Sequence, residues 1–83
     1  MMLSDEIKAL LEGGPEAVIE LELTYRNGGK VLGTIRKWSP RRGKLLIQKS
    51  DPAEGERPRH RAVFDHVESM RILMADGSEH RFD

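Results

Sequence analysis

The sequence predicts a mainly β domain, in which one short N-terminal helix is followed by five or six short antiparallel strands. Apolar residues in the first twelve positions recur at helical spacing, whereas from Val18 onward apolar and polar residues alternate. The alternating segments are separated by turn sequences at Asn27-Gly28, Gly43 and Asp76-Gly77. No repeat or linker divides the chain, so its 83 residues are expected to form a single domain.

The helix is expected over residues 3–12. Ser4 suits the N-cap position, because its hydroxyl can accept a hydrogen bond from a free backbone N–H of the first turn. One apolar stripe runs along this segment and consists of Leu3, Ile7, Leu10 and Leu11. Gly13-Gly14-Pro15 is expected to end the helix. A helix this short is marginal alone, so we expect it to pack on the rest of the domain.

Strands one to three are expected within residues 18–49. The first covers Val18 to Tyr25, and its alternation places one set of side chains on a common face, namely Ile19, Leu21, Leu23 and Tyr25. Asn27-Gly28 predicts a hairpin turn, since both residues tolerate positive φ. The second strand is expected from Lys30 to Trp38, with a bend or bulge at Gly33.

The third strand is expected from Lys44 to Lys49, after a turn over residues 39–43. Residues 50–59 contain two prolines and mixed charge, which is typical of an exposed, mobile loop. Residues 60–83 are expected to hold the fourth strand (60–65), the fifth (67–75) and a C-terminal hairpin that turns at Asp76-Gly77.

Charge is distributed unevenly although the net charge is zero. Residues 1–25 carry six acidic and one basic side chain, whereas residues 26–61 carry eleven basic and three acidic ones. The middle segment is therefore a candidate anion-binding surface. The alternative is an ordinary mixed surface, in which basic strands pair with acidic neighbours.

The composition narrows the class of protein. Without cysteine there is no disulfide or thiolate metal site, and small domains without such staples often associate. No apolar run approaches the roughly 20 residues of a membrane span, and the first residues do not have the pattern of a signal peptide. We expect a cytoplasmic protein that forms oligomers, binds no cofactor or metal, and does not contact a membrane.

Two segments resemble motifs of the Sm/Lsm superfamily, most closely those of the bacterial RNA chaperone Hfq. Asn27-Gly28, followed by Lys30 and Gly33, resembles the first motif, a turn that leads to a bent strand. Val63-Phe64-Asp65-His66-Val67 with Ser69 resembles the second motif of Hfq, an aromatic-x-His segment followed by a serine. The resemblance covers the helix to about Leu73. It implies a small, strongly bent, Sm-like (SH3-like) barrel that assembles into a homo-oligomeric ring and binds RNA.

The resemblance and the basic segment together predict the residues of a nucleic-acid-binding site. From the resemblance come His66, Phe64 and, on the opposite face of the ring, Lys30. From the basic segment come Arg36, Arg41 and Arg42, with Lys37 and Lys44 beside them, because arginine and lysine suit phosphate. Trp38 offers a ring for base stacking, although a core or interface role is the alternative.

A second functional class stays open at this point. Asp65 stands where Hfq has a lysine beside the histidine, and an acid repels phosphate. This exchange and the zero net charge favour a protein-interaction or scaffolding module on the same fold. An enzyme is not expected, because the sequence contains no nucleophile motif and no phosphate-binding glycine loop.

Overall fold

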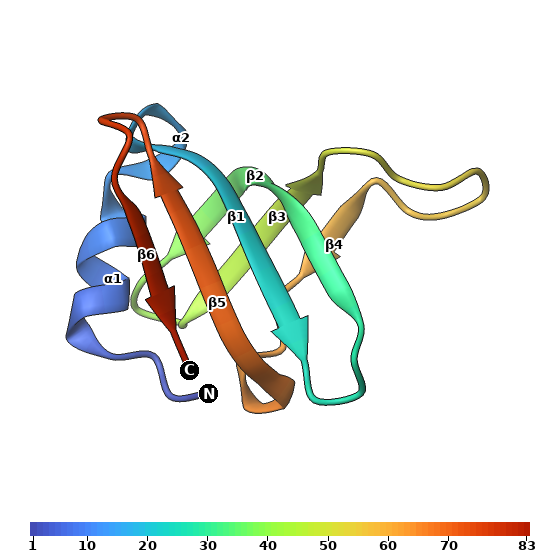
Figure 1. The fold of residues 1–83 in the computed structure, drawn as a ribbon, viewed down its shortest axis with the longest axis horizontal. Helices are drawn as coiled ribbons and strands as arrows, with labels where there is room; N and C mark the ends of the chain where they lie inside the picture. Colours follow the sequence, from blue (N-terminus) through green and yellow to red (C-terminus); the bar gives the residue numbers. More distant parts are fainter.

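The protein consists of one six-stranded antiparallel sheet that follows two short helices (Figure 1). The computed structural model covers residues 1–83. The elements are α1 (Asp5–Glu12), α2 (Gly14–Ala17), β1 (Val18–Tyr25), β2 (Lys30–Ser39), β3 (Lys44–Lys49), β4 (Arg59–Arg61), the 3-10 turn η1 (Phe64–His66), β5 (Val67–Met74) and β6 (Glu79–Phe82). The strand order is β4-β3-β2-β1-β5-β6, so β4 and β6 are unpaired edges of an open sheet. The prediction of a mainly β chain with an N-terminal helix is confirmed.

Helix α1 ends at the predicted residue but begins at Asp5, directly after the N-cap Ser4 and two residues later than the predicted range 3–12. The Ile7 backbone N–H donates to the Ser4 hydroxyl oxygen at 3.2 Å, and the helix ends at Glu12. The second helix, α2, was not predicted. Gly14 takes a φ of 64°, and Pro15 then lies in the first turn of α2, where its missing N–H removes no helical hydrogen bond.

Strand β1 has the predicted bounds but not the predicted inward face at its start. Ile19 is 52% exposed, while Val18 and Leu21 are buried. The pairing of β1 with β5 shifts register between Val18 and Glu20. This bulge adds a residue to β1 and turns Ile19 outward, so the expectation that Ile19 shares a face with Leu21 is wrong.

The turn between β1 and β2 is a hairpin, as predicted, but only one of its residues has positive φ. Gly28 has a φ of 88°, and no residue other than glycine has a positive value in the chain. The Gly28 N–H donates to the Tyr25 carbonyl, and the Tyr25 N–H donates to the Gly29 carbonyl. The loop therefore has three residues, with a glycine in the last position, and Asn27 keeps negative φ.

Strand β2 changes partner at Gly33. Its first residues pair with β1, and its later residues pair with β3; Gly33 belongs to both ladders, opposite Leu21 and Lys49. A Cβ atom on Gly33 would lie 2.1 Å from the Gln48 carbonyl oxygen, so only glycine fits this close approach. The register irregularity itself lies between Ile35 and Lys37, which places the bulge beyond the predicted position.

The predicted fourth strand is shorter than expected. Strand β4 covers Arg59–Arg61 only, and Phe64–His66 forms η1 instead of continuing the strand. The His66 N–H donates to the Val63 carbonyl at 2.9 Å, which closes this turn. The Ala62 N–H donates to Leu45 as the last bond of the β3–β4 ladder, and the chain then leaves β3 to reach β5.

The hairpin between β5 and β6 has the same geometry as the hairpin between β1 and β2. Gly77 has a φ of 89°, and its N–H donates to the Met74 carbonyl, while the Met74 N–H donates to Ser78. The predicted turn at Asp76-Gly77 is thus confirmed, and it adds β6 beside β5.

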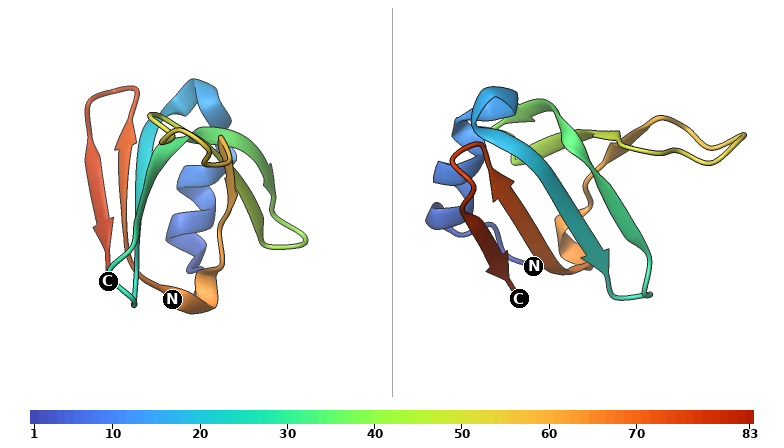
Figure 2. Two further views of the ribbon diagram at one scale, coloured as in Figure 1. Left: turned by 90° about the vertical axis from the view of Figure 1, so that its right-hand side faces the viewer. Right: turned by 45° about the horizontal axis from the view of Figure 1, so that its top comes forward.

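A single core holds both parts of the sheet together. Ile7 and Leu11 of α1 are buried in a cluster that also contains Leu21, Leu23, Ile35, Leu45, Ile47, Val67, Met70 and Ile72. In Figure 2 (left), α1 stands between β1, β5 and β6 on one side and β4 on the other. The predicted packing of the apolar stripe of α1 on the sheet is therefore confirmed. No helix of the chain has the length and apolar character needed to span a membrane.

Candidate nucleic-acid interface

The outward face of β2, β3 and β4 carries a hollow of about 260 Å³ that is rich in basic side chains. We call it the cationic hollow, and it is lined by Lys37, Ser39, Arg42, Lys44, Leu45, Leu46 and Arg61. Leu46 of β3 pairs with Lys37 of β2 on one side and with Arg61 of β4 on the other. Ser39 pairs with Lys44 in the next part of the β2–β3 ladder. Three cationic side chains from three strands, together with Arg42 of the β2–β3 turn, thus line this hollow.

These four positive charges have no acidic partner within the chain. The ion pairs of the structure involve Lys49, Arg71 and Arg81, and none reaches Lys37, Arg42, Lys44 or Arg61. No acidic residue lines the hollow. Neighbouring like charges without counter-charges create a positive potential, and this favours an anionic ligand.

The turn between β2 and β3 extends the basic surface. Arg41 and Arg42 are exposed in this turn, and both line a shallower hollow of about 550 Å³ together with Lys37, Trp38, Ser39 and Pro40. The two hollows share Lys37, Ser39 and Arg42. Arg36 lies at the irregularity of β2 and is exposed, but it lines neither hollow. The structure therefore brings Trp38, Arg41 and Arg42 together, as the sequence predicted.

Trp38 lies between the core and this surface. It is half-buried, pairs with the buried Leu45 and packs against the core cluster, although part of it lines the shallow hollow. Its Nε1 atom is buried and has no hydrogen-bond partner. This placement agrees with the core role that the sequence left open, while the stacking role depends on the exposed part of the side chain.

Phe64 and His66 belong to a different part of the molecule. Both lie on η1, where Phe64 is half-buried against the core and His66 is exposed. The Met1 backbone nitrogen donates to the Phe64 carbonyl at 2.7 Å, and the Arg26 N–H donates to the His66 carbonyl at 2.9 Å. Neither side chain lines the cationic hollow; His66 lines a small hollow with Tyr25, Arg26 and Asn27.

The 3-10 turn also changes how Asp65 and His66 relate to each other. In a strand, adjacent side chains point to opposite faces, but residues of a tight turn do not alternate in that way. Both side chains are exposed on η1. Asp65 therefore remains close to any anion that approaches His66.

Lys30 lies at the start of β2, on the part of the sheet formed with β1, β5 and β6. It lines a hollow of about 300 Å³ together with Glu22, Thr24, Ser69, Met70, Arg71, Arg81 and Asp83. This hollow mixes acidic and basic side chains. The predicted residues thus do not form one site. Lys30 lies here, Phe64 and His66 lie on η1, and Trp38, Arg41 and Arg42 lie around the β2–β3 turn, while Arg36 lies on β2 outside both basic hollows.

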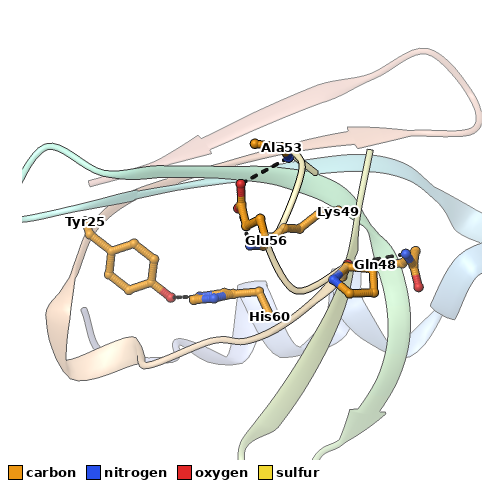
Figure 3. Close-up of polar contacts among 7 residues, drawn as sticks. Tyr25, Gln48, Lys49, Ala53, Glu56 and His60 are labelled. Carbon is orange, nitrogen blue, oxygen red and sulfur yellow. Dashed lines mark hydrogen bonds and ion pairs between the residues drawn. The ribbon is translucent and has the colours of Figure 1, made fainter. Parts of the chain in front are cut away.

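A hydrogen-bonded pair holds β4 in place against the end of β1. The Tyr25 hydroxyl bonds to Nε2 of His60 (Figure 3). The same hydroxyl oxygen accepts the Val63 N–H at 3.2 Å. Burial, followed by the charge of Lys49, lowers the pKa of His60, which favours its neutral form. Burial raises the pKa of Tyr25, although the Val63 hydrogen bond opposes the shift. Since side chains alternate along a strand, an inward His60 directs Arg59 and Arg61 outward.

The loop between β3 and β4 projects away from the body of the protein (Figure 1). Its residues 50–58 are exposed, as predicted. Glu56 forms an ion pair with Lys49 and accepts the Ala53 N–H, which closes a tight turn at its tip (Figure 3). These contacts lower the pKa of the Glu56 carboxyl.

Sequence reasoning missed Arg61 as a member of the site. Lys37 and Lys44 stand close to the predicted arginines in the chain, but Arg61 follows an exposed loop and reaches the site only through the pairing of β4 with β3. The available signal was the alternation Arg59-His60-Arg61, which places both arginines on one face of a strand.

The structure contains no cluster of three or more His, Cys, Asp or Glu side chains that could hold a metal ion. No protein-family model, curated protein or solved structure matches the chain. Function must therefore be argued from the geometry and charge of the surface itself.

Proposed function

We propose that this protein binds RNA or another single-stranded nucleic acid, without catalysis, through the basic surface around the β2–β3 turn. The cationic hollow is the observation that carries this proposal, because four basic side chains meet there without an acidic residue. Arginine and lysine side chains release condensed counterions when they bind phosphates, which supplies most of the affinity for a nucleic-acid backbone. His66 and Phe64 on η1 and Lys30 on β2 add secondary contacts in this proposal.

We propose further that the sheet is a variant of the Sm-like barrel, left open between β4 and β6 within one chain, and that it assembles into a homo-oligomeric ring. The two open edges support this assembly. The backbone hydrogen bonds at Ala62, Lys49 and Met74 show which residues of each edge strand are bonded to the neighbouring strand. The remaining peptide groups face away from the sheet, namely those of Arg59 and Arg61 on β4 and those of Glu79 and Arg81 on β6. Pairing of β4 with β6 of a second copy covers both edges, and head-to-tail pairing of this kind can close into a ring.

The mass of the native particle tests the assembly. Light scattering on a sizing column is expected to give about five to seven subunits, each of 9.4 kDa. A Glu79→Lys substitution adds a positive charge to β6, which already carries Arg81. In the proposed ring this charge faces the arginines of β4 in the next subunit, so the substitution is expected to lower the mass of the particle. A monomeric wild type would contradict the ring, and the proposal of nucleic-acid binding would then rest on the basic surface only.

RNA binding is tested by fluorescence anisotropy with a labelled RNA of mixed sequence. Affinity is expected to fall steeply as salt rises, and the double substitution Arg41→Ala/Arg42→Ala is expected to weaken binding about tenfold at low salt. Arg57→Ala is the matched control, because Arg57 is exposed on the loop between β3 and β4 and lines neither basic hollow. Equal losses in both variants would argue against a site at the β2–β3 turn.

The second candidate is a protein-interaction or scaffolding module on the same fold. Asp65 favours it, since this acid is exposed beside His66 on η1. A particle of ring size that fails to bind RNA even at low salt would support this candidate and exclude the first.

A further inference from the structure

The cationic hollow has a regular arrangement that specifies its ligand more closely than its charge alone does. Lys37, Leu46 and Arg61 form one row across three adjacent strands, each in register with the next. Neighbouring strands lie about 4.8 Å apart, so Lys37 and Arg61 leave the sheet about 10 Å from each other. Lys44 stands two residues along the ladder, opposite Ser39, and so on the same face as the row. The cations are thus spread along a path instead of surrounding one point.

The groups that line this path suit phosphates and sugars but not bases. No aromatic ring lines the hollow, and its acceptors for base donors are limited to Ser39 and backbone carbonyls. Base recognition normally requires stacking rings or groups that pair with base edges. Leu46 provides a half-buried apolar floor between the charges, which a sugar ring can cover.

We infer that the cationic hollow holds successive phosphates of one chain laid across β2, β3 and β4, with Lys37 and Arg61 on different phosphates, and that it contacts no base. The inference rests on the proposed nucleic-acid function, because it identifies the ligand of the same surface. Its chemistry is that of a linear phosphate chain, for which a nucleic-acid backbone is the source that we favour and inorganic polyphosphate is the other source. Binding through this path is independent of base sequence.

The test compares variants in which glutamine replaces a basic residue, so that the charge is removed and a polar side chain is kept. The first is Lys37→Gln/Arg61→Gln, and the control is Arg57→Gln, a basic residue of the exposed loop between β3 and β4 that lines neither basic hollow. Labelled oligonucleotides of about 12 nucleotides, oligo(U) and oligo(A), are titrated in parallel over a range of salt. Inorganic polyphosphate is titrated as a competitor. Circular dichroism melting checks that each variant is folded. Folding is expected because all three positions are exposed.

The double variant is expected to bind both oligonucleotides at least tenfold more weakly at low salt, by the same factor for each. The slope of log affinity against log salt is expected to fall by about 1.4, which is about 0.7 for each lost contact with a single strand. Polyphosphate is expected to displace RNA from the wild type and to bind the double variant less tightly. The control is expected to stay within twofold of the wild type.

Different failures have different meanings. Unchanged RNA affinity and salt slope in the folded double variant would overturn the inference while leaving the proposed function in place. A sequence preference that disappears in the double variant would also overturn it, because the hollow would then read bases. Polyphosphate binding that depends on Lys37 and Arg61, in a wild type that ignores RNA, would support the phosphate path and overturn the proposed function.

Discussion

The two halves of the sheet have similar inward faces and very different outward faces. They meet at Gly33, where β2 passes from β1 to β3. In the half formed with β1, β5 and β6, Arg71 pairs with Glu20 and lies 4.0 Å from Glu22, and Arg81 pairs with Glu79. In the half formed by the rest of β2 with β3 and β4, only Lys49 has an acidic partner.

The inward faces of the two halves follow from the fold, whereas their outward faces do not. Both halves contribute buried aliphatic residues to one core, so the core accounts for the shared inward pattern. Uncompensated positive charge adds nothing to this packing, and its self-repulsion opposes the compact state. The basic outward face therefore points to a ligand, whereas the balanced face is explained by the chain itself.

The largest effect is expected where the two halves join. Gly33→Ala places a Cβ atom within 2.1 Å of the Gln48 carbonyl oxygen and 2.7 Å of Ile47 Cγ2, so backbone must move. We expect a loss of about 3 kcal/mol in the free energy of unfolding, measured by urea denaturation. Thr34→Ala, one residue on and exposed, is the control and should cost much less. A wild-type stability for Gly33→Ala would show that the halves do not depend on this close approach.

A smaller effect is expected at the tether of the basic half. Tyr25→Phe removes the hydroxyl that accepts the Val63 N–H and bonds to His60. We expect a loss of about 1–2 kcal/mol in unfolding free energy, because both partners lose a hydrogen bond in a partly buried place. Hydrogen exchange should quicken in β4 more than in β6. Equal changes at both edges would contradict a tether that is specific to β4.

The outward charges are expected to give opposite results in the two halves. Arg71→Ala breaks the contacts with Glu20 and Glu22 and should cost about 0.5 kcal/mol, which is typical of a partly exposed ion pair. Arg61→Ala removes an uncompensated charge and should leave stability unchanged or slightly higher at low salt. Thermal melts at two salt concentrations measure both. A larger loss for Arg61→Ala would mean that the basic face serves the fold.

The smallest effect is expected from pH. The pKa of His60 is lower in the folded protein than its ordinary value of 6.5, so protonation favours the unfolded chain. This contribution to stability is fully present above about pH 6.5 and is lost as the pH falls below that value. Urea midpoints from pH 7.5 to 5 should fall more for the wild type than for His60→Gln. A parallel fall in both would remove His60 as the cause.

The sequence was a good guide wherever local chemistry decides structure. The N-cap at Ser4, the turns that end in Gly28 and Gly77, and the alternation in β3 each depend on residues next to one another. The outward turn of Ile19 follows instead from a bulge against β5, whose residues are about fifty positions away. Arg61 joins the cationic hollow because β4 pairs with β3 across an exposed loop. Alternation could give the common face of Arg59 and Arg61, but no local pattern shows which strand β4 pairs with.

The single tryptophan provides an optical probe of the surface that we propose to be functional. The Trp38 indole nitrogen is buried without a partner, and the same residue lines the shallower hollow with Arg41 and Arg42. An indole in such surroundings emits at shorter wavelength than one in water, and nearby charge alters its emission. Fluorescence of the unlabelled chain can therefore follow both ligand titration at the β2–β3 turn and denaturation of the core behind it.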